Sequence, residues 1–227
     1  MTGTGLRDVL LLALPRLAAS EEELRDLDAA IGDGDLGITV SAGCAAAVAC
    51  IQALPESATP ASVLRTIAPA VARANPSTFS ALVSAALLAA SRALETSSAP
   101  GTLELIDAGR IAAQTIAARG KSALGDKTVL DALVPSLDAA EQHPDAPLSA
   151  AINAARLGVE STRGLASSRG RAAWIGERTR GHADPGATAY LRLLEAIAAS
   201  QAATRTAEEP AAGRRPRMLS IHAPREQ

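Results

Sequence analysis

A chain of 227 residues is long enough to bury one sizeable core, and its net charge of −2 argues against nucleic acid as a partner. Aromatic residues make up only 1% of it, so alanine and leucine must supply the core, which favours closely packed helices. The first residues lack the basic region of a secretory signal, and no apolar run reaches the roughly 18 residues that span a bilayer. We therefore expect a soluble cytoplasmic protein with no membrane span.

Hydrophobic spacing and capping signals predict nine helical segments and no strand, hence an all-α fold. The segments lie at about 6–19, 20–32, 37–54, from Pro60 onward, 76–96, 103–118, 127–142, 148–165 and 185–204. The second is short enough to merge with a neighbour, and Pro135 is a candidate kink or break in the seventh. Ser20, Asn75, Asp126 and Asp184 are the expected N-caps of four segments. We assign 1–207 to one domain and expect 208–227, whose composition cannot bury a core, to be a disordered tail.

The two cysteines, Cys44 and Cys50, lie six residues apart within one predicted helix. This spacing places them on different faces of the helix, so they cannot form a disulfide with each other. They are expected to be small core residues.

The most informative segment is an acidic, glycine-rich loop that contains Asp28, Asp33 and Asp35. Three carboxylates so close together repel one another unless a cation lies between them. Carboxylate oxygens are the ligands that Mg²⁺ prefers, and Mg²⁺ in proteins commonly accompanies phosphate. The loop therefore predicts a site for Mg²⁺ and a nucleotide. The alternative is a helix C-terminus followed by a solvated Asp-Gly turn.

Two further segments are typical of phosphate or nucleotide contact. The first is Gly125 to Leu133, where a glycine precedes a helix start and lets a ligand approach the backbone. The second is Ser168 to Ala187, which is rich in arginine and glycine and contains His182. The single tryptophan, Trp174, lies in this second segment, so we expect the segment to be packed. An ordinary capped helix start and a structural histidine are the alternatives.

A fourth candidate is the stretch Asn75 to Ser80, in which hydroxyl side chains accompany a predicted helix N-terminus. Free backbone N–H groups at such a terminus bind anions. Alone, this stretch is a weak signal.

Together these segments resemble the L subunit of dihydroxyacetone kinase, the Dak2 or nucleotide-binding domain. The matching stretches are Leu27 to Gly37, Gly125 to Pro135 and Gly170 to Ala187, in the order of the family. The resemblance covers roughly residues 5–205. It implies a barrel-like antiparallel bundle of eight amphipathic helices with the nucleotide at one end.

The resemblance also implies functional residues and partners. Asp28, Asp33 and Asp35 match the aspartates that hold two Mg²⁺ ions against the phosphates of ATP or ADP. The nucleotide-binding positions would be Ser77, Thr78, Ser80, Gly125, Val129, Arg171, Asp184, Pro185 and Gly186. In the family a separate K subunit or domain holds the sugar on a histidine. The phosphoryl donor is either ATP or a bound ADP that a phosphotransferase-system protein recharges.

The sequence departs from the family pattern at two places. Leu36 replaces a histidine after the third aspartate, and Phe79 falls in a phosphate loop where a small residue is expected. Two functions remain open. One is the nucleotide-binding subunit of a kinase for dihydroxyacetone or a related ketose such as erythrulose. The other is a non-catalytic module that binds a lipid in an apolar cavity or docks to a regulatory partner.

Overall fold

The structure, a computed structural model, describes residues 3–208 and contains α-helices and short 3₁₀ turns, with no strand in that range. The all-α prediction is therefore confirmed. The helices are α1 (Gly3–Ala18), α2 (Glu21–Ile31), α3 (Leu36–Gln52), α4 (Pro60–Ala74), α5 (Thr78–Ala93), α6 (Thr102–Gly120), α7 (Leu130–Gln142), α8 (Pro147–Ser161) and α9 (Pro185–Glu208). The predicted tail, apart from Glu208, lies outside the described residues, so the domain boundary stays a prediction.

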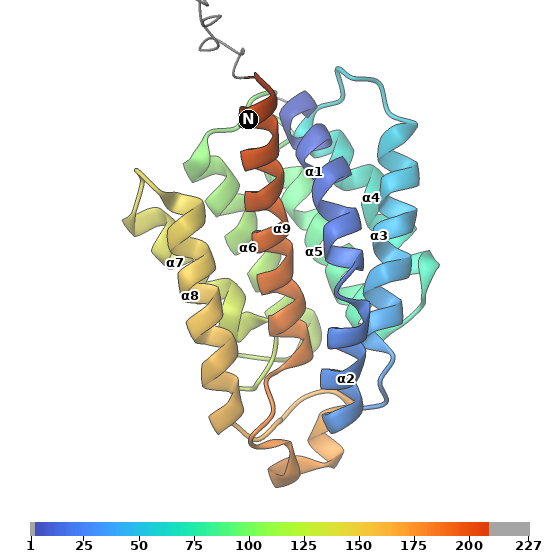
Figure 1. Cartoon of the computed structure of the whole chain (residues 1–227), viewed down its shortest axis with the longest axis vertical. Coiled ribbons are helices and arrows are strands. Elements are labelled where there is room, and N and C mark those ends of the chain that lie inside the picture. Colours follow the sequence, from blue (N-terminus) through green and yellow to red (C-terminus); the bar gives the residue numbers. More distant parts are fainter. Residues whose placement is uncertain (1–2, 209–227) are drawn as a thin grey trace, which may run out of the picture.

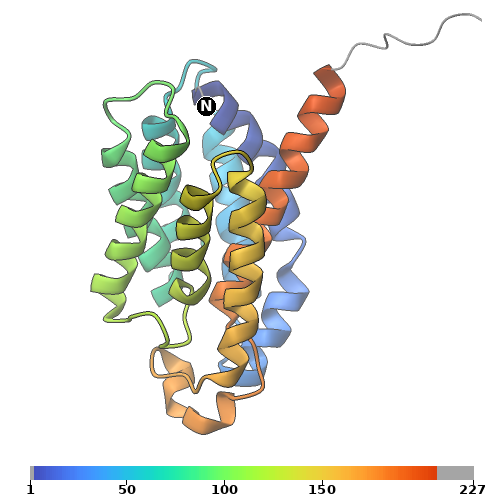
Figure 2. The same ribbon diagram turned by 90° about the vertical axis from the view of Figure 1, so that its left-hand side faces the viewer.

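The helices form a closed ring (Figures 1 and 2). From α3 to α9 each helix packs against the next one in the chain, and α1 packs against both α3 and α9 to close the ring. The short α2 also packs against α3 and α9, so it occupies the same place in the ring as α1, nearer one end. The nine α-helices of residues 3–208 thus fill eight places, as the resemblance implied.

The alternating direction of the helices brings distant parts of the sequence together. From α2 onward successive helices run antiparallel, so every second connection lies at the same end of the ring. The four connections at that end are residues 32–35, 75–77, 121–129 and 162–184. These are the four segments that the sequence marked as chemically informative. The fold therefore gathers them around one end of the barrel.

The core is built mainly from alanine, leucine, isoleucine and valine. Its largest cluster lies among α1 to α4, and further clusters join α5, α6 and α7 and then α7, α8 and α9. Cys44 is buried in the first cluster and Cys50 is partly buried against it, and both are free thiols. This confirms the prediction that the two cysteines do not bridge.

Pro135 does not break α7, although it has no N–H to donate to the carbonyl of Asp131, four residues earlier. The helix runs continuously from Leu130 to Gln142. Gly158 of α8 lies so close to this turn that a Cβ on it would overlap the carbonyl oxygen of Asp131. Only glycine permits this approach of α8.

Two of the predicted N-caps are wrong, and a third is confirmed only in its position. Ser20 is the N-cap residue of α2, but its side chain makes no capping hydrogen bond. The cap of α5 is Ser77 rather than Asn75, whose amide instead donates to the hydroxyl of Thr39. Asp126 does not cap α7, because Lys127 has a φ of 61° and the helix begins only at Leu130. A left-handed residue cannot lie inside a right-handed helix.

The fourth predicted cap is confirmed. The carboxylate of Asp184 accepts a hydrogen bond from the N–H of Ala187, and Pro185 is the first residue of α9. A proline at this position loses no helical hydrogen bond. The same holds at α4, where the hydroxyl of Thr59 accepts from Ser62 and Pro60 follows it.

Candidate metal and nucleotide site

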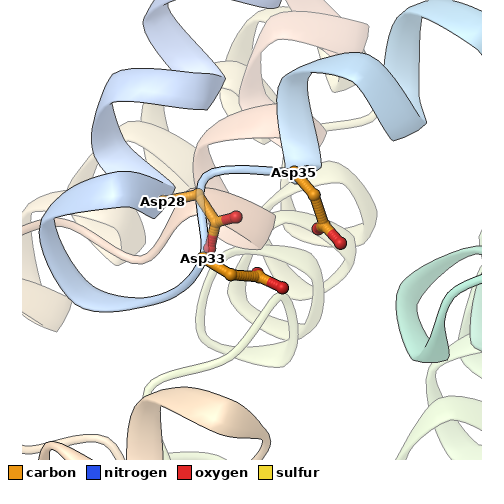
Figure 3. A group of neighbouring side chains, drawn as sticks. All are labelled: Asp28, Asp33 and Asp35. Carbon is orange, nitrogen blue, oxygen red and sulfur yellow. The ribbon is translucent and has the colours of Figure 1, made fainter.

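The acidic loop forms a cluster of three carboxylates. Asp28 lies in the last turns of α2, Asp33 in the connecting loop and Asp35 immediately before α3. Each offers one oxygen such that the three oxygens lie within 4.8 Å of one another. Figure 3 shows the three side chains directed into a common space. A cation in that space would be within reach of all three.

Glycines make this arrangement possible. A Cβ on Gly32 would lie 2.5 Å from Oδ1 of Asp28, so a larger residue would displace that carboxylate. Gly34 has a φ of 76°, which glycine adopts without strain and which turns the chain sharply between Asp33 and Asp35. Gly37 lies against the backbone of α2, where a Cβ would overlap the carbonyl oxygen of Glu21.

The electrostatics of the cluster also fit a cation. Partial burial, followed by the nearby charge of Asp28, raises the pKa of Asp35. The backbone also orients the carboxylate of Asp28, because its Oδ2 accepts a hydrogen bond of 3.1 Å from the N–H of Leu36. Leu36 itself is buried, so the position that carries histidine in the family here joins the core. Hard oxygen ligands and a local excess of negative charge suit Mg²⁺ or a similar divalent cation.

The cluster forms one wall of a cavity of about 260 Å³ at this end of the barrel. Most of the residues predicted to contact the nucleotide line the same cavity. These are Asp28, Asp33, Asp35, Ser77, Thr78, Val129, Asp184, Pro185 and Gly186. Residues from four separate stretches of the chain therefore face one space.

The N-terminus of α5 provides hydrogen-bond donors to this cavity. Ser77 and Ser80 form a capping box, in which each side chain accepts from the other's backbone N–H. The first four N–H groups of a helix have no acceptor within it, and the box satisfies two of them. Thr78 and Phe79 carry the other two N–H groups, and both residues line the cavity. Such a terminus favours an anion.

Phe79 occupies the place where a smaller residue was expected. Its ring is partly buried against the core cluster of α1 to α4 and lies 3.6 Å from where a Cβ on Gly186 would be. The ring thus fits against the bare backbone at the start of α9. Phe79 narrows the cavity, and the absence of a side chain at Gly186 leaves room for it.

Two predicted nucleotide residues are placed differently, and a third is not tested. Ser80 is buried and its hydroxyl serves the capping box, so it shapes the helix terminus without lining the cavity. Gly125, with a φ of 90°, lines a neighbouring cavity of about 510 Å³ between α7 and α8. The side chain of Arg171 lies outside the described part of the structure.

The segment between α8 and α9 closes this end of the barrel with three 3₁₀ turns, which follow Ser161, Gly170 and Ile175. The carboxylate of Asp126 ties it down by accepting from the hydroxyl of Ser168 at 2.6 Å and from Nε of Arg169 at 2.9 Å. These hydrogen bonds, with one from the N–H of Ala123, lower the pKa of Asp126 to about 2. Asp126 is therefore a tether for this segment.

One expectation about the segment is wrong. Trp174 was expected to pack, but its side chain is 93% exposed. The segment is ordered by hydrogen bonds of its backbone, and not by an aromatic anchor. His182 is likewise exposed, and the group that it contributes is its carbonyl, which accepts a hydrogen bond from Lys127.

Residue-type patterns missed three contributors to the site. Thr128, Arg169 and Lys127 line the cavity, and Lys127 is the largest side chain that is almost fully buried. A buried lysine cannot be recognised from a motif alone. The one available signal was its rarity, because this chain contains only two lysines.

Comparison with known proteins places this chain in a family. The DAK2 domain family matches residues 30–199. The chain belongs to the DAK2 family. It is 33% identical to the ADP-binding subunit DhaL of PEP-dependent dihydroxyacetone kinase 1 from Listeria innocua, over 80% of this chain and 88% of that subunit.

Longer relatives contain the DAK2 domain as one part. The chain is 34% identical to L-erythrulose 1-kinase of Mycolicibacterium smegmatis, over 79% of this chain but only 32% of that enzyme. The dihydroxyacetone kinase of C. freundii, solved with AMP-PNP and Mg²⁺, superposes with a TM-score of 0.70 at 28% identity, over 86% of this chain and 33% of that one. The relatives are thus phosphotransferases or subunits of them. In the part of this DAK2 protein that the structure describes, no helix is long and apolar enough to cross a membrane.

Proposed function

We propose that this DAK2 protein is the nucleotide- and Mg²⁺-binding subunit of a two-component kinase for dihydroxyacetone or a related short ketose. The observation that carries the proposal is the cluster of Asp28, Asp33 and Asp35, whose oxygens lie within 4.8 Å of one another on the wall of a cavity. The start of α5 lines the same cavity and offers donors to phosphate. Relatives named as ADP-binding subunits and as ketose kinases support the same chemistry.

In this proposal each wall of the cavity has a role. The three aspartates would hold Mg²⁺, two ions as in the family. The N–H groups of Thr78 and Phe79, with the hydroxyls of Ser77 and Thr78, would bind phosphate oxygens. Val129 would border the adenine, and residues 184–186, with Arg171, would close the site. Ser80 would act through the capping box, and Gly125 through the turn that precedes α7.

The chain's own residues would mainly position the reactants. Phosphoryl transfer requires in-line alignment and stabilisation of charge more than a covalent catalyst. Bound Mg²⁺ would supply the charge neutralisation. The aspartates would fix where the phosphates lie, and the capped start of α5 would orient them for in-line transfer. The hydroxyl that accepts it would come from a sugar held by a separate K subunit.

Two phosphoryl donors fit this site. In one version ATP exchanges freely and is the donor. In the other, ADP stays bound and is recharged by a phosphotransferase-system protein, and the name "PEP-dependent" of the Listeria relative favours it. The rate at which purified protein exchanges bound ADP distinguishes them. Slow exchange indicates a resident ADP and fast exchange indicates free ATP.

The reaction is tested by assaying ketose phosphorylation with a K subunit and Asp33→Ala. The variant is expected to lose transfer while its circular dichroism and unfolding midpoint stay close to those of the wild type. Full activity of Asp33→Ala would refute the assignment. If the wild type binds no Mg²⁺–ADP but carries a co-purified lipid detectable by mass spectrometry, the alternative of a lipid-binding module is favoured instead.

A further inference from the structure

Lys127 is buried in an unusual environment at the inner edge of the site. The residue is only 1% exposed. Its Nζ donates hydrogen bonds to four backbone carbonyl oxygens. Those of Thr162, Thr179 and His182 lie at 2.9, 2.8 and 2.6 Å, and that of Leu165 lies at 3.2 Å. A buried ammonium group is costly unless its hydrogen bonds are made. Here the four carbonyl groups take the place of water as hydrogen-bond acceptors for the ammonium group.

The four acceptors all belong to the segment that closes the barrel. They lie near its start, at 162 and 165, and near its end, at 179 and 182. A single cation therefore binds two stretches of backbone, which are also joined by a hydrogen bond of 2.8 Å from the N–H of Gly181 to the carbonyl of Arg163. An ammonium group has three N–H bonds, and the four carbonyls use all of them. Lys127 lines the cavity but has no donor left for a phosphate.

The turn that carries Lys127 is held in place by two carboxylates. Asp131 accepts from the N–H groups of Gly125 and Thr128, at 2.5 and 2.7 Å, and Asp126 accepts from Ala123. These bonds help to hold Lys127 in its left-handed conformation, which is unfavourable for a non-glycine residue. A backbone held in this conformation directs the lysine inward.

The hydroxyls around the ammonium extend its hold to α9. Thr162 accepts from the N–H of Asp184, and Thr179 accepts from the N–H of Ser167, at 2.8 Å each. Thr162 and Thr179 are the same residues whose carbonyls bind Lys127. The position of Asp184, and with it the start of α9 on the cavity wall, is thus linked to the ammonium through one residue.

We propose that Lys127 is a positioning residue. Its ammonium group holds residues 162–182 in place through their four carbonyls, and it thereby fixes the position of the cavity wall that faces the nucleotide. The functional half of this inference rests on the proposed function, and the structural half does not. Arginine would not serve, because its planar fork spreads five donors over three nitrogens, whereas the four carbonyls converge on one atom.

The test uses Lys127→Gly, since glycine accepts the left-handed backbone and removes only the cation and its stem. The matched control is Lys121→Met, because Lys121 also has a positive φ, of 49°, but is exposed. Limited trypsin digestion with mass mapping measures how accessible residues 162–182 are to cleavage, since Arg163, Arg169, Arg178 and Arg180 lie within that segment. We expect Lys127→Gly to be cut there at least tenfold faster than the wild type, and the control to be unchanged.

Chemical rescue distinguishes the effect of the positive charge of Lys127 from the effect of filling its space. Butylammonium, which has the four carbons and the nitrogen of the missing side chain, should restore protease resistance and Mg²⁺–ADP affinity to Lys127→Gly, whereas neutral butanol, with the same number of heavy atoms, should not. Resistance equal to the wild type without any amine, or equal rescue by butanol, would overturn the proposal. If Mg²⁺–ADP fails to bind even the wild type, the proposed function fails, while the digestion and rescue still decide the role of Lys127.

A measurement on the wild type covers the case in which Lys127→Gly does not fold. Mild acetylation of the native protein should modify Lys121 rapidly and leave Lys127 unmodified, because only Lys121 is exposed. In increasing urea, acetylation of Lys127 should begin together with tryptic cleavage within 162–182. Acetylation of native Lys127 at the rate of Lys121, with the segment still resistant to trypsin, would contradict the inference.

Discussion

Oδ1 of Asp28 lies only 2.5 Å from the point that a Cβ on Gly32 would occupy, so the metal cluster requires glycine at this position. Gly32→Ala should push the carboxylate away from the space shared with Asp33 and Asp35. We expect Mg²⁺-dependent ADP affinity to fall at least tenfold, which corresponds to about 1.4 kcal/mol. Calorimetric titration measures it. Gly164→Ala is the control, because a Cβ there meets nothing within 4 Å, and an equal loss in both variants would argue against this role of Gly32.

The crossing of α7 and α8 predicts opposite effects for two glycine-to-alanine changes. Gly158→Ala would overlap the carbonyl of Asp131 and should destabilise the fold by about 1–3 kcal/mol, the usual cost of overpacking. Gly43→Ala in α3 would meet Val71 at an ordinary 3.5 Å and should be neutral or stabilising by up to about 1 kcal/mol, since alanine favours helix. Urea unfolding measures both. The same sign of change in the two variants would contradict the packing described here.

Asp184 predicts how stability depends on pH. Its burial raises the pKa of the carboxyl from 3.8 to about 7. Between these values the folded chain holds the proton that the unfolded chain has released, so this group makes the fold less stable as the pH rises from 4 to 7. At 1.36 kcal/mol per pKa unit the loss is at most about 4 kcal/mol.

Asp184→Asn keeps an oxygen acceptor for the N–H of Ala187 and removes the titration. Urea unfolding of both proteins at pH 4, 5, 6, 7 and 8 should show the wild type losing stability relative to the variant up to pH 7 and no further change above it. A constant difference across this range would contradict the pKa assigned to Asp184.

The exposed tryptophan predicts a fluorescence signature. Because Trp174 is the sole tryptophan and is 93% exposed, its emission should resemble that of free tryptophan and be quenched readily by iodide. It lies two residues after Ala172, which lines the cavity. Mg²⁺–ADP should therefore change its quenching, and Asp33→Asn should abolish that change. A blue-shifted emission that iodide fails to quench would show that the segment packs differently.

Much of the fold and most of the site follow from local patterns. The helices were predictable because their apolar spacing acts within a few residues, as do the prolines that begin two of them, Pro60 and Pro185. The acidic cluster was predictable because its three aspartates lie within one short loop. Their repulsion, and the glycines between them, can be recognised without any distant contact.

The features that were missed depend on distant contacts. Lys127 contacts carbonyls 35 to 55 residues later in the chain, and carbonyls are present at every residue, so no side-chain pattern marks them. Asp126 was assigned as a cap because caps are its commonest role, whereas its partners Ser168 and Arg169 lie across the barrel end. The exposure of Trp174 was missed because the rarity of tryptophan in this chain does not by itself indicate packing.

The central claim is that three aspartates and a bound divalent cation hold a nucleotide, and calorimetric titration of ADP tests it most directly. The wild type should bind ADP with Mg²⁺ and lose that binding in EDTA. Asp33→Asn should not bind, whereas Asp145→Asn, which removes an exposed carboxylate in the turn between α7 and α8, should bind as the wild type does. Binding of ADP that is equal with Mg²⁺ and with EDTA, or that survives in Asp33→Asn, would contradict the account.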